Sequence, residues 1–271
     1  PAQTGTRQAK AGRSVPRRPA LLMRLTDRHR ITAATWNPAA ADLLATLSTD
    51  GRISIWRMVD EQEPHEIRSL RLPYGRSGRL AWLPAGRQLA CATEDGSVSV
   101  WDISSGARRT ATLGDEVACL SLSAGTDDVL RAVYQDGSVR RLVAGRPGPL
   151  RARRITPVIA AAWSATGHRL VAALDGGVLE VRDDALDLQW GRETPGDALA
   201  FAWHGDAEIV LADRAAKQLI ALDAHGRALW EINLGTPPTS VAAADGVVAV
   251  GGCNFRPHLV DLRTGAPLTG P

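Results

Sequence analysis

A repeat of about 40 residues constrains this chain more than any other feature of its sequence. Six apolar runs end, each before a short polar stretch, at Trp36, Trp82, Leu122, Trp163, Trp203 and Ala243. An acidic residue follows in each of the first five units, at Asp50, Asp95, Asp136, Asp175 and Asp213. A sustained period of this length indicates that similar structural units stack on one another and bury a continuous core.

Each unit has the pattern of a four-stranded meander. In the second unit, β-rich runs at Gln88–Thr93 and Ser97–Ile103 flank Asp95 and Gly96. An Asp-Gly pair between two such runs is a strong hairpin signal, because Gly adopts the positive φ of the turn at little cost.

Both faces of these sheets are expected to be covered. Val98 and Val100 lie on the face opposite to Trp101, and neighbouring blades of a propeller cover each other in this way. We therefore predict an all-β fold, a β-propeller of four-stranded antiparallel blades, with six blades counted and a seventh left open. Residues 20–271 are assigned to the propeller and residues 1–19 to a basic flexible arm or linker.

The units resemble the WD-repeat family of β-propellers over about residues 20–265. The best match is Glu94–Asp102, which ends on the Trp-Asp pair that names the family, and Thr49–Trp56 is nearly as close. Later units depart from this pattern, because other residues stand in place of Trp-Asp at Arg141–Leu142, Val181–Arg182, Leu222–Asp223 and Val260–Asp261. In similar propellers an N-terminal strand completes the last blade. The resemblance implies that Ala20–Leu25 forms this strand.

The resemblance also implies a hydrogen-bond network made by His29, Ser48, Asp50 and Trp56. Ser, His and Asp together suggest a hydrolase triad, but a nucleophile needs an exposed hydroxyl beside an oxyanion site, whereas this set would hold a turn. We interpret the five turn aspartates, Trp56 and Trp101 as structural and predict no catalytic residue.

No metal or cofactor is predicted. The histidines lack His-x-x-x-His spacing, and neither a phosphate-binding Gly-rich loop nor a Gly-x-Ser-x-Gly elbow occurs. Cys91, Cys119 and Cys253 lack Cys-x-x-Cys spacing, so we expect buried free thiols in a reducing, cytoplasmic compartment. We find no secretory signal and no apolar run of about 18 residues that could span a membrane.

The positive charge is concentrated at the start of the chain. Residues 1–30 carry a net charge of +7, whereas the other residues carry −4, within a total of +3. Any nucleic-acid binding would therefore depend on the arm. The chain begins with Pro1, which suggests a piece of a longer protein.

In the WD-repeat family, the connections into the first strands and the Asp-Gly turns share a docking face. The matching positions, of mixed charge, are His29, Arg30, Arg76, Asp115, Glu116, Arg154 and Asp197. They favour a protein or peptide partner and a scaffold or sensor module within a larger regulatory protein. The alternatives are a hydrolase-type or quinoprotein-like enzyme, the latter because Leu219–Trp230 is similar to quinoprotein repeats, and a nucleic-acid binder acting through the arm.

Overall fold

The computed structural model describes residues 29–58, 63–72, 78–112, 117–143, 146–147, 155–194, 199–252 and 258–268. All regular elements within these ranges are β-strands. The described part of the chain therefore contains no helix that could cross a membrane.

Strands follow one another at short intervals along the whole described chain. Their bounds are β1 (Ile31–Trp36), β2 (Leu43–Ser48), β3 (Arg52–Arg57), β4 (His65–Arg71), β5 (Gly78–Trp82), β6 (Gln88–Thr93), β7 (Ser97–Asp102), β8 (Arg108–Thr112), β9 (Cys119–Ala124), β10 (Val129–Tyr134), β11 (Val139–Val143), β12 (Arg146–Pro147), β13 (Val158–Trp163), β14 (Arg169–Leu174), β15 (Val178–Asp183), β16 (Leu188–Glu193), β17 (Leu199–His204), β18 (Glu208–Asp213), β19 (Gln218–Leu222), β20 (Ala228–Asn233), β21 (Pro238–Ala244), β22 (Val247–Gly252) and β23 (His258–Asp261).

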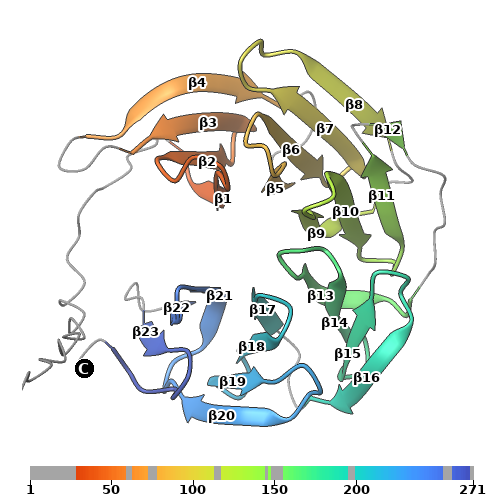
Figure 1. The fold of residues 1–271 in the computed structure, drawn as a ribbon, viewed down its shortest axis with the longest axis vertical. Coiled ribbons are helices and arrows are strands. Elements are labelled where there is room, and N and C mark those ends of the chain that lie inside the picture. The colour runs from red at the N-terminus through yellow and green to blue at the C-terminus, as the bar shows by residue number, and fades with distance from the viewer. Residues whose placement is uncertain are drawn as a thin grey trace, which may run out of the picture.

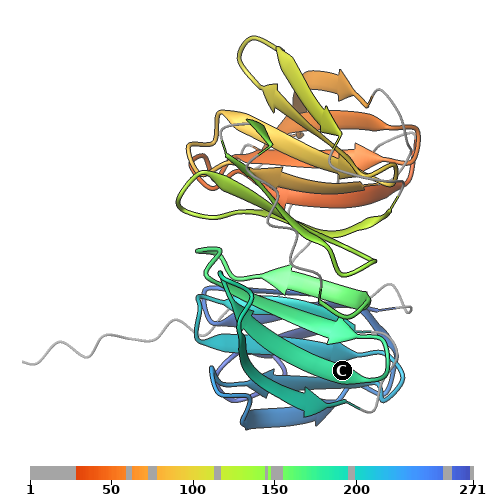
Figure 2. The same ribbon diagram turned by 90° about the vertical axis from the view of Figure 1, so that its right-hand side faces the viewer.

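These strands form six antiparallel sheets, which are the blades of a β-propeller (Figure 1). Blades 1 to 5 contain four strands each, from β1–β4 to β17–β20, and blade 6 contains β21–β23. Seen from the side, blades 1 to 3 form one half of the molecule and blades 4 to 6 the other (Figure 2). The all-β propeller fold and the six blades predicted from the repeat are confirmed.

Tight turns join the strands where the sequence carries its Asp-Gly pairs. Gly96, between β6 and β7, has a φ of 76°, which a residue with a side chain adopts only with strain. The Gly96 amide donates to the carbonyl oxygen of Thr93 at 3.1 Å, closing the turn. The predicted strand at Gln88–Thr93 has the observed bounds.

The core lies between the blades. Five clusters of buried apolar side chains are found among the described residues, one at each junction from blades 1 and 2 to blades 5 and 6. Val98 and Val100 of blade 2 belong to the cluster shared with blade 3, whereas Trp101 belongs to the cluster shared with blade 1. The prediction that both faces of this sheet are covered is therefore correct.

Two tryptophans at the ends of first strands join one blade to the preceding one. The indole nitrogen Nε1 of Trp82 donates to the carbonyl oxygen of Thr35 at 3.1 Å, and that of Trp203 donates to Ala162 at 3.0 Å. Both indoles are more than nine-tenths buried. Each ring thus removes apolar area from water while its polar N–H group keeps a hydrogen bond.

A second type of tryptophan contact joins the outer edges of blades 4, 5 and 6. Trp190 on β16 donates from Nε1 to Ala224 of blade 5 at 2.8 Å, and Trp230 on β20 donates to Leu262 of blade 6 at 2.6 Å. Each ring lies against a turn glycine of the next blade, and a Cβ atom added to Gly226 would be 2.8 Å from Trp190 Cε3. Gly226 and Trp230 belong to Leu219–Trp230, the stretch whose sequence is similar to quinoprotein repeats. In the structure both residues make contacts between neighbouring blades.

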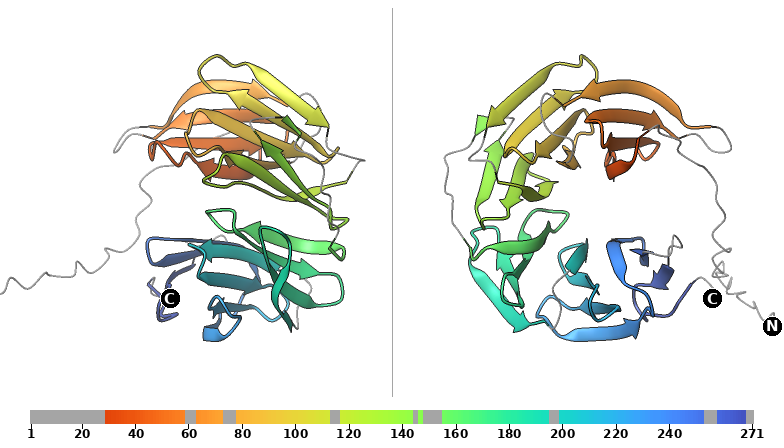
Figure 3. Two further views of the ribbon diagram at one scale, coloured as in Figure 1. Left: turned by 45° about the vertical axis from the view of Figure 1, so that its right-hand side comes forward. Right: turned by 180° about the vertical axis from the view of Figure 1, so that it is seen from behind.

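Among the described residues, no blade-to-blade packing closes the propeller between its last and first blades. The first strands of successive blades lie side by side from β1 to β21, but no comparable contact joins β21 to β1 in the described part of the chain (Figure 3). The strand expected at Ala20–Leu25 lies outside the described residues. Beyond β23, Pro267 forms an isolated bridge with Val260.

The tryptophan–glycine contact predicts an unequal response to two glycine substitutions. Gly226 and Gly235 both have positive φ, 78° and 70°, but an added Cβ atom would meet Trp190 at Gly226 and no atom within 4 Å at Gly235. Urea unfolding should show that Gly235→Ala lowers the free energy of unfolding by about 1 kcal/mol. Gly226→Ala adds steric conflict with the ring, so its loss should be about 2–4 kcal/mol. Equal losses would contradict a role for the docked indole.

Candidate functional site

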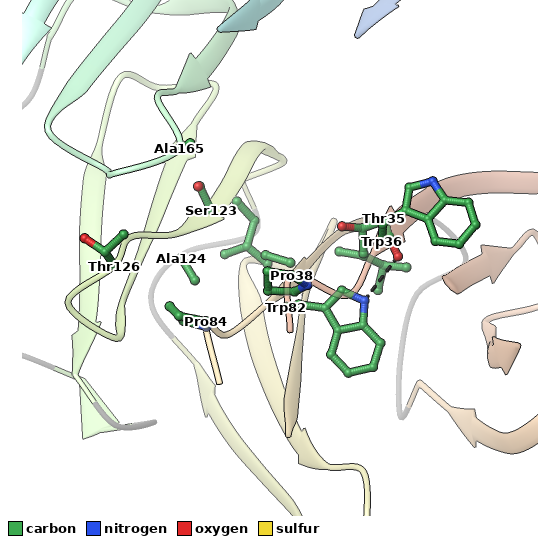
Figure 4. Close-up of a pocket in the computed structure, with 12 residues that line it drawn as sticks. Thr35, Trp36, Pro38, Trp82, Pro84, Ser123, Ala124, Thr126 and Ala165 are labelled. Carbon is green, nitrogen blue, oxygen red and sulfur yellow. Dashed lines mark hydrogen bonds between the residues drawn. The ribbon is translucent and has the colours of Figure 1, made fainter. Parts of the chain in front are cut away.

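A hollow in the described structure lies where the first strands of blades 1 to 3 end. Its volume is about 280 Å³. The walls are formed by the ends of β1, β5 and β9 and by the turns that follow them (Figure 4). The residues that line it are Thr35, Trp36, Pro38, Leu80, Ala81, Trp82, Pro84, Leu122, Ser123, Ala124, Thr126 and Ala165.

Asn37 fixes the first two walls relative to each other. Its side-chain oxygen Oδ1 accepts hydrogen bonds from the backbone of Ala39 and Ala40 at 2.9 and 3.0 Å, and its Nδ2 donates to the Gly86 carbonyl at 2.8 Å. A Cβ atom at residue 86 would collide with Asn37 Oδ1, and φ is +68° there, so the close approach requires Gly86. The turns that carry Pro38 and Pro84 are therefore joined across the blade boundary.

Arg131 fixes the third wall. Its guanidinium is only 1% exposed, although it donates two hydrogen bonds to Asp127, at 2.7 and 3.0 Å, and one to Asp184 of blade 4 at 3.1 Å. The hydrogen bond from Arg131 lowers the pKa of Asp127 to about 2. Because Asp127 lies in the turn between β9 and β10, this ion pair holds Thr126 in its place in the wall.

The lining of the hollow contains no ionisable side chain. It is composed of tryptophan, proline and aliphatic groups with the hydroxyls of Thr35, Ser123 and Thr126 at intervals. The indole of Trp36 points away from the hollow and is 54% exposed, whereas Trp82 is hydrogen-bonded to Thr35 (Figure 4). Such a surface can bind an uncharged apolar group with a few hydrogen bonds, but it offers no acid or base.

The docking face expected from sequence lies at the opposite end of β1. His29 and Arg30 precede this strand and are exposed, whereas the hollow begins at its last residues. His29 Nε2 lies 3.8 Å from Asp50 Oδ2. The other positions expected on that face lie outside the described residues, namely Arg76, Asp115, Glu116, Arg154 and Asp197.

The residues of the polar network expected in blade 1 lie close together, and the network also includes Thr46. Ser48 donates to Asp50 at 2.7 Å, and this hydrogen bond is the main reason that the pKa of Asp50 is below its usual range. Trp56 donates from Nε1 to Thr46 at 2.8 Å and not to Ser48. Thr46 and Ser48 lie on the same face of β2, two residues apart, and the indole reaches the former.

The other turn residues singled out by the repeat have varied surroundings. Asp95 accepts hydrogen bonds from Thr93 and Ser97, and Asp136 accepts two from Ser138. The remaining residues differ from one another. Asp213 is buried and accepts a hydrogen bond from the backbone amide of Ala216. Asp175 is exposed, and Trp101 is 3% exposed between blades 1 and 2.

No group of three or more potential metal ligands occurs among the residues that the structure describes. Cys91 and Cys119 are free and buried, as expected from their apolar surroundings, and burial raises the pKa of each thiol to about 12. Both therefore stay protonated and are poor nucleophiles near neutral pH. Cys253 lies outside the described residues.

Sequence reasoning missed the hollow, although the residues that form it were visible. Trp36-Asn37-Pro38 and Trp82-Leu83-Pro84 served only as markers of the period. The signal that could have identified the site is their shared position, because turns that follow equivalent inner strands meet at one end of a propeller axis.

Comparison with known families supports the same architecture. A family model described as the anaphase-promoting complex subunit 4 WD40 domain matches residues 34–124. The matched segment contains most of blade 1, all of blade 2 and the first strand of blade 3, and thus most of the residues around the hollow. No curated protein matches the chain.

The Arg131–Asp127 pair predicts a specific pH dependence of stability. A carboxyl whose pKa is lowered by folding stabilises the folded state above its unfolded pKa, and this contribution is lost as the pH falls from about 4 to about 2. Asp127→Asn should flatten the decline of the unfolding free energy in that range. At pH 7 it should cost about 1 kcal/mol, a value kept low because Asp127 is partly exposed.

Asp128→Asn is the matched control for this prediction. Asp128 is the next residue, is exposed and has a φ of 58°, which Asn tolerates well. Chemical denaturation of the three proteins at several pH values provides the measurement. A parent-like pH profile for Asp127→Asn would show that the ion pair does not stabilise the wall.

Proposed function

We propose that this chain, which belongs to the WD-repeat family of β-propellers, holds an uncharged, apolar segment of a partner protein in the hollow at the ends of β1, β5 and β9. Propellers of this family generally mediate protein–protein interactions. We also propose that the chain acts as a scaffold or sensor module within a larger regulatory protein.

The observation that carries the proposal is a fixed, uncharged concavity on the surface of the propeller. Its walls include Pro38, Pro84 and Leu122, and two polar anchors, Asn37 and Arg131, hold them in position. A preformed apolar pocket binds a peptide with little loss of its own conformational entropy. Hydroxyl groups at the rim can hydrogen-bond to the peptide backbone of the bound segment.

The face that carries His29 and Arg30 stays a second proposed contact for the same partner. Both side chains are exposed there, beside the β2–β3 turn. Charged groups at such an exposed rim affect the rate and salt dependence of association more than its final affinity. We therefore assign the main binding energy to the hollow.

We predict that one charge added to the wall of the hollow weakens partner binding. Ala124 is half-buried in its wall, so Ala124→Arg places a guanidinium among apolar groups and should weaken partner binding by at least about tenfold. The matched control is Ala215→Arg, at an exposed position in the β18–β19 turn, far along the chain from the hollow. The measurement is quantitative capture of protein partners from native lysate by parent and variants.

Two further outcomes decide between the two faces. Equal capture by Ala124→Arg and the parent, with melting temperatures unchanged, would overturn the assignment to the hollow. If Arg30→Glu instead abolishes capture at physiological salt, the opposite face carries the binding energy. Capture of nucleic acid, lost when residues 1–19 are removed, would replace protein binding with the arm hypothesis.

A further inference from the structure

One arginine is the only lysine, arginine, aspartate or glutamate in the six first strands. This residue is Arg79 on β5, and the first strands are β1, β5, β9, β13, β17 and β21. His204, at the end of β17, is the one other side chain in these strands that can carry a positive charge. The six strands surround the propeller axis (Figure 1). Arg79 therefore places a formal charge on an inner wall that is otherwise apolar or neutral.

The side chain of Arg79 crosses from blade 2 to blade 3. Its Nε donates to the carbonyl oxygen of Leu120 on β9 at 2.9 Å. Its charge also reaches Cys119 on the same strand: burial raises the pKa of this thiol to about 12, and the charge of Arg79 opposes the rise. The guanidinium is thus held between the innermost strands of two blades.

Most of the hydrogen-bonding capacity of Arg79 remains available. A guanidinium has five N–H donors, and the bond to Leu120 uses one of them. Arg79 is exposed, and none of the ion pairs within the described part of the chain involves it. By contrast, Arg131 and Arg182 each pair with a carboxylate. The terminal nitrogens of Arg79 can therefore donate to a group on another molecule.

Strand β5 leads from Arg79 to the hollow. Ala81, two residues further along β5, lines the hollow, and so does Leu122, two residues after Leu120 on β9. Arg79 and Ala81 lie on the same face of blade 2, because residues two apart in a strand point to the same side. Two residues of a strand span about 6.6 Å. The guanidinium thus lies one such step from the wall of the hollow.

The hollow and Arg79 together can bind two different chemical groups. A cavity of about 150 Å³ holds a benzene ring, so the hollow, at about 280 Å³, has room for one large apolar side chain. The planar guanidinium of Arg79 matches the two oxygens of a carboxylate and forms charge-assisted hydrogen bonds with it. In an extended peptide, residues two apart also point to the same side and are about 6.6 Å apart.

We propose that the bound segment carries an aspartate or glutamate two residues from the apolar side chain that fills the hollow, and that this carboxylate pairs with Arg79. The inference rests on the proposed function of the hollow and names the chemistry of its partner. The carboxylate stays outside the uncharged lining, so the apolar part of the segment is buried without a charge. The hollow supplies most of the binding energy, whereas Arg79 selects among apolar segments by charge.

Selection from a random peptide library tests the charge and the spacing. Phage that display random dodecapeptides are selected on the immobilised full chain. The parent should enrich a large apolar residue with Asp or Glu two positions away, whereas Arg79→Glu should enrich Lys or Arg at that position. The matched control is Arg108→Glu, on the exposed outer strand β8 of the same blade, which should keep the acidic preference.

Binding of one enriched peptide, measured by fluorescence anisotropy, tests the ion pair itself. Replacing the carboxylate of the peptide by its amide leaves the protein untouched and should weaken binding to the parent about threefold to fivefold, as for an ion pair partly open to water. The same replacement should not change binding to Arg79→Gln, and its effect on the parent should shrink at high salt. An equal loss with both proteins would assign the carboxylate to another group and overturn the proposal.

The peptides also separate this inference from the proposed function. Suppose that the parent enriches apolar peptides without an acid at the stated position, and that Ala124→Arg no longer binds them. The hollow then keeps its function, and the role of Arg79 is refuted. Enriched peptides that bind Ala124→Arg as well as the parent would refute both the hollow as their site and the pairing with Arg79. Failure to enrich any peptide would overturn both.

Discussion

Face-to-face contact between neighbouring blades is the interaction on which the rest of this structure depends. A four-stranded sheet with apolar side chains on both faces, such as blade 2, is stable only when a sheet covers each face. Val98 and Val100 bury one face against blade 3, and Trp101 buries the other against blade 1. The blades therefore stabilise one another in sequence, and the central axis and its surrounding turns result from their packing.

The turns that form the hollow are held by few polar contacts. Asn37 links two turns across a blade boundary, and Arg131 links a third to blade 4 through Asp184. Both anchors are almost fully buried, at 4% and 1% exposure, so their hydrogen bonds are protected from water. A rigid framework that presents fixed loops is typical of proteins whose function is recognition.

The repeat predicted the fold well because its signals are local. Asp95 and Gly96 define a tight turn, and the alternation from Val98 to Trp101 assigns side chains to two faces, so strand positions follow from nearby residues alone. Contacts between blades are different, because they join residues about 40 positions apart. The Asn37–Gly86 bond and the docking of Trp190 on Gly226 depend on how two blades meet, which no single unit specifies.

The candidate site shows the same division. Trp36, Pro38 and Pro84 were visible as markers of the period, but their convergence depends on propeller geometry. The resemblance to WD repeats implied a network of His29, Ser48, Asp50 and Trp56. In the structure Ser48 donates to Asp50, whereas the indole of Trp56 donates to Thr46, two residues before Ser48 on the same face. Of the docking positions expected from the family, the structure describes His29 and Arg30 and leaves the others untested.

Hydrogen–deuterium exchange of the first strands tests most directly the claim that contacts between neighbouring blades stabilise the propeller. All six strands occupy the same innermost position, so they differ mainly in whether neighbouring blades cover both faces. The account predicts that β1 and β21, each of which lies beside one other blade among the described residues, exchange faster than β5, β9, β13 and β17, which lie between two blades. Equal protection of all six strands would contradict it and would show that blades 1 and 6 are covered in the isolated protein.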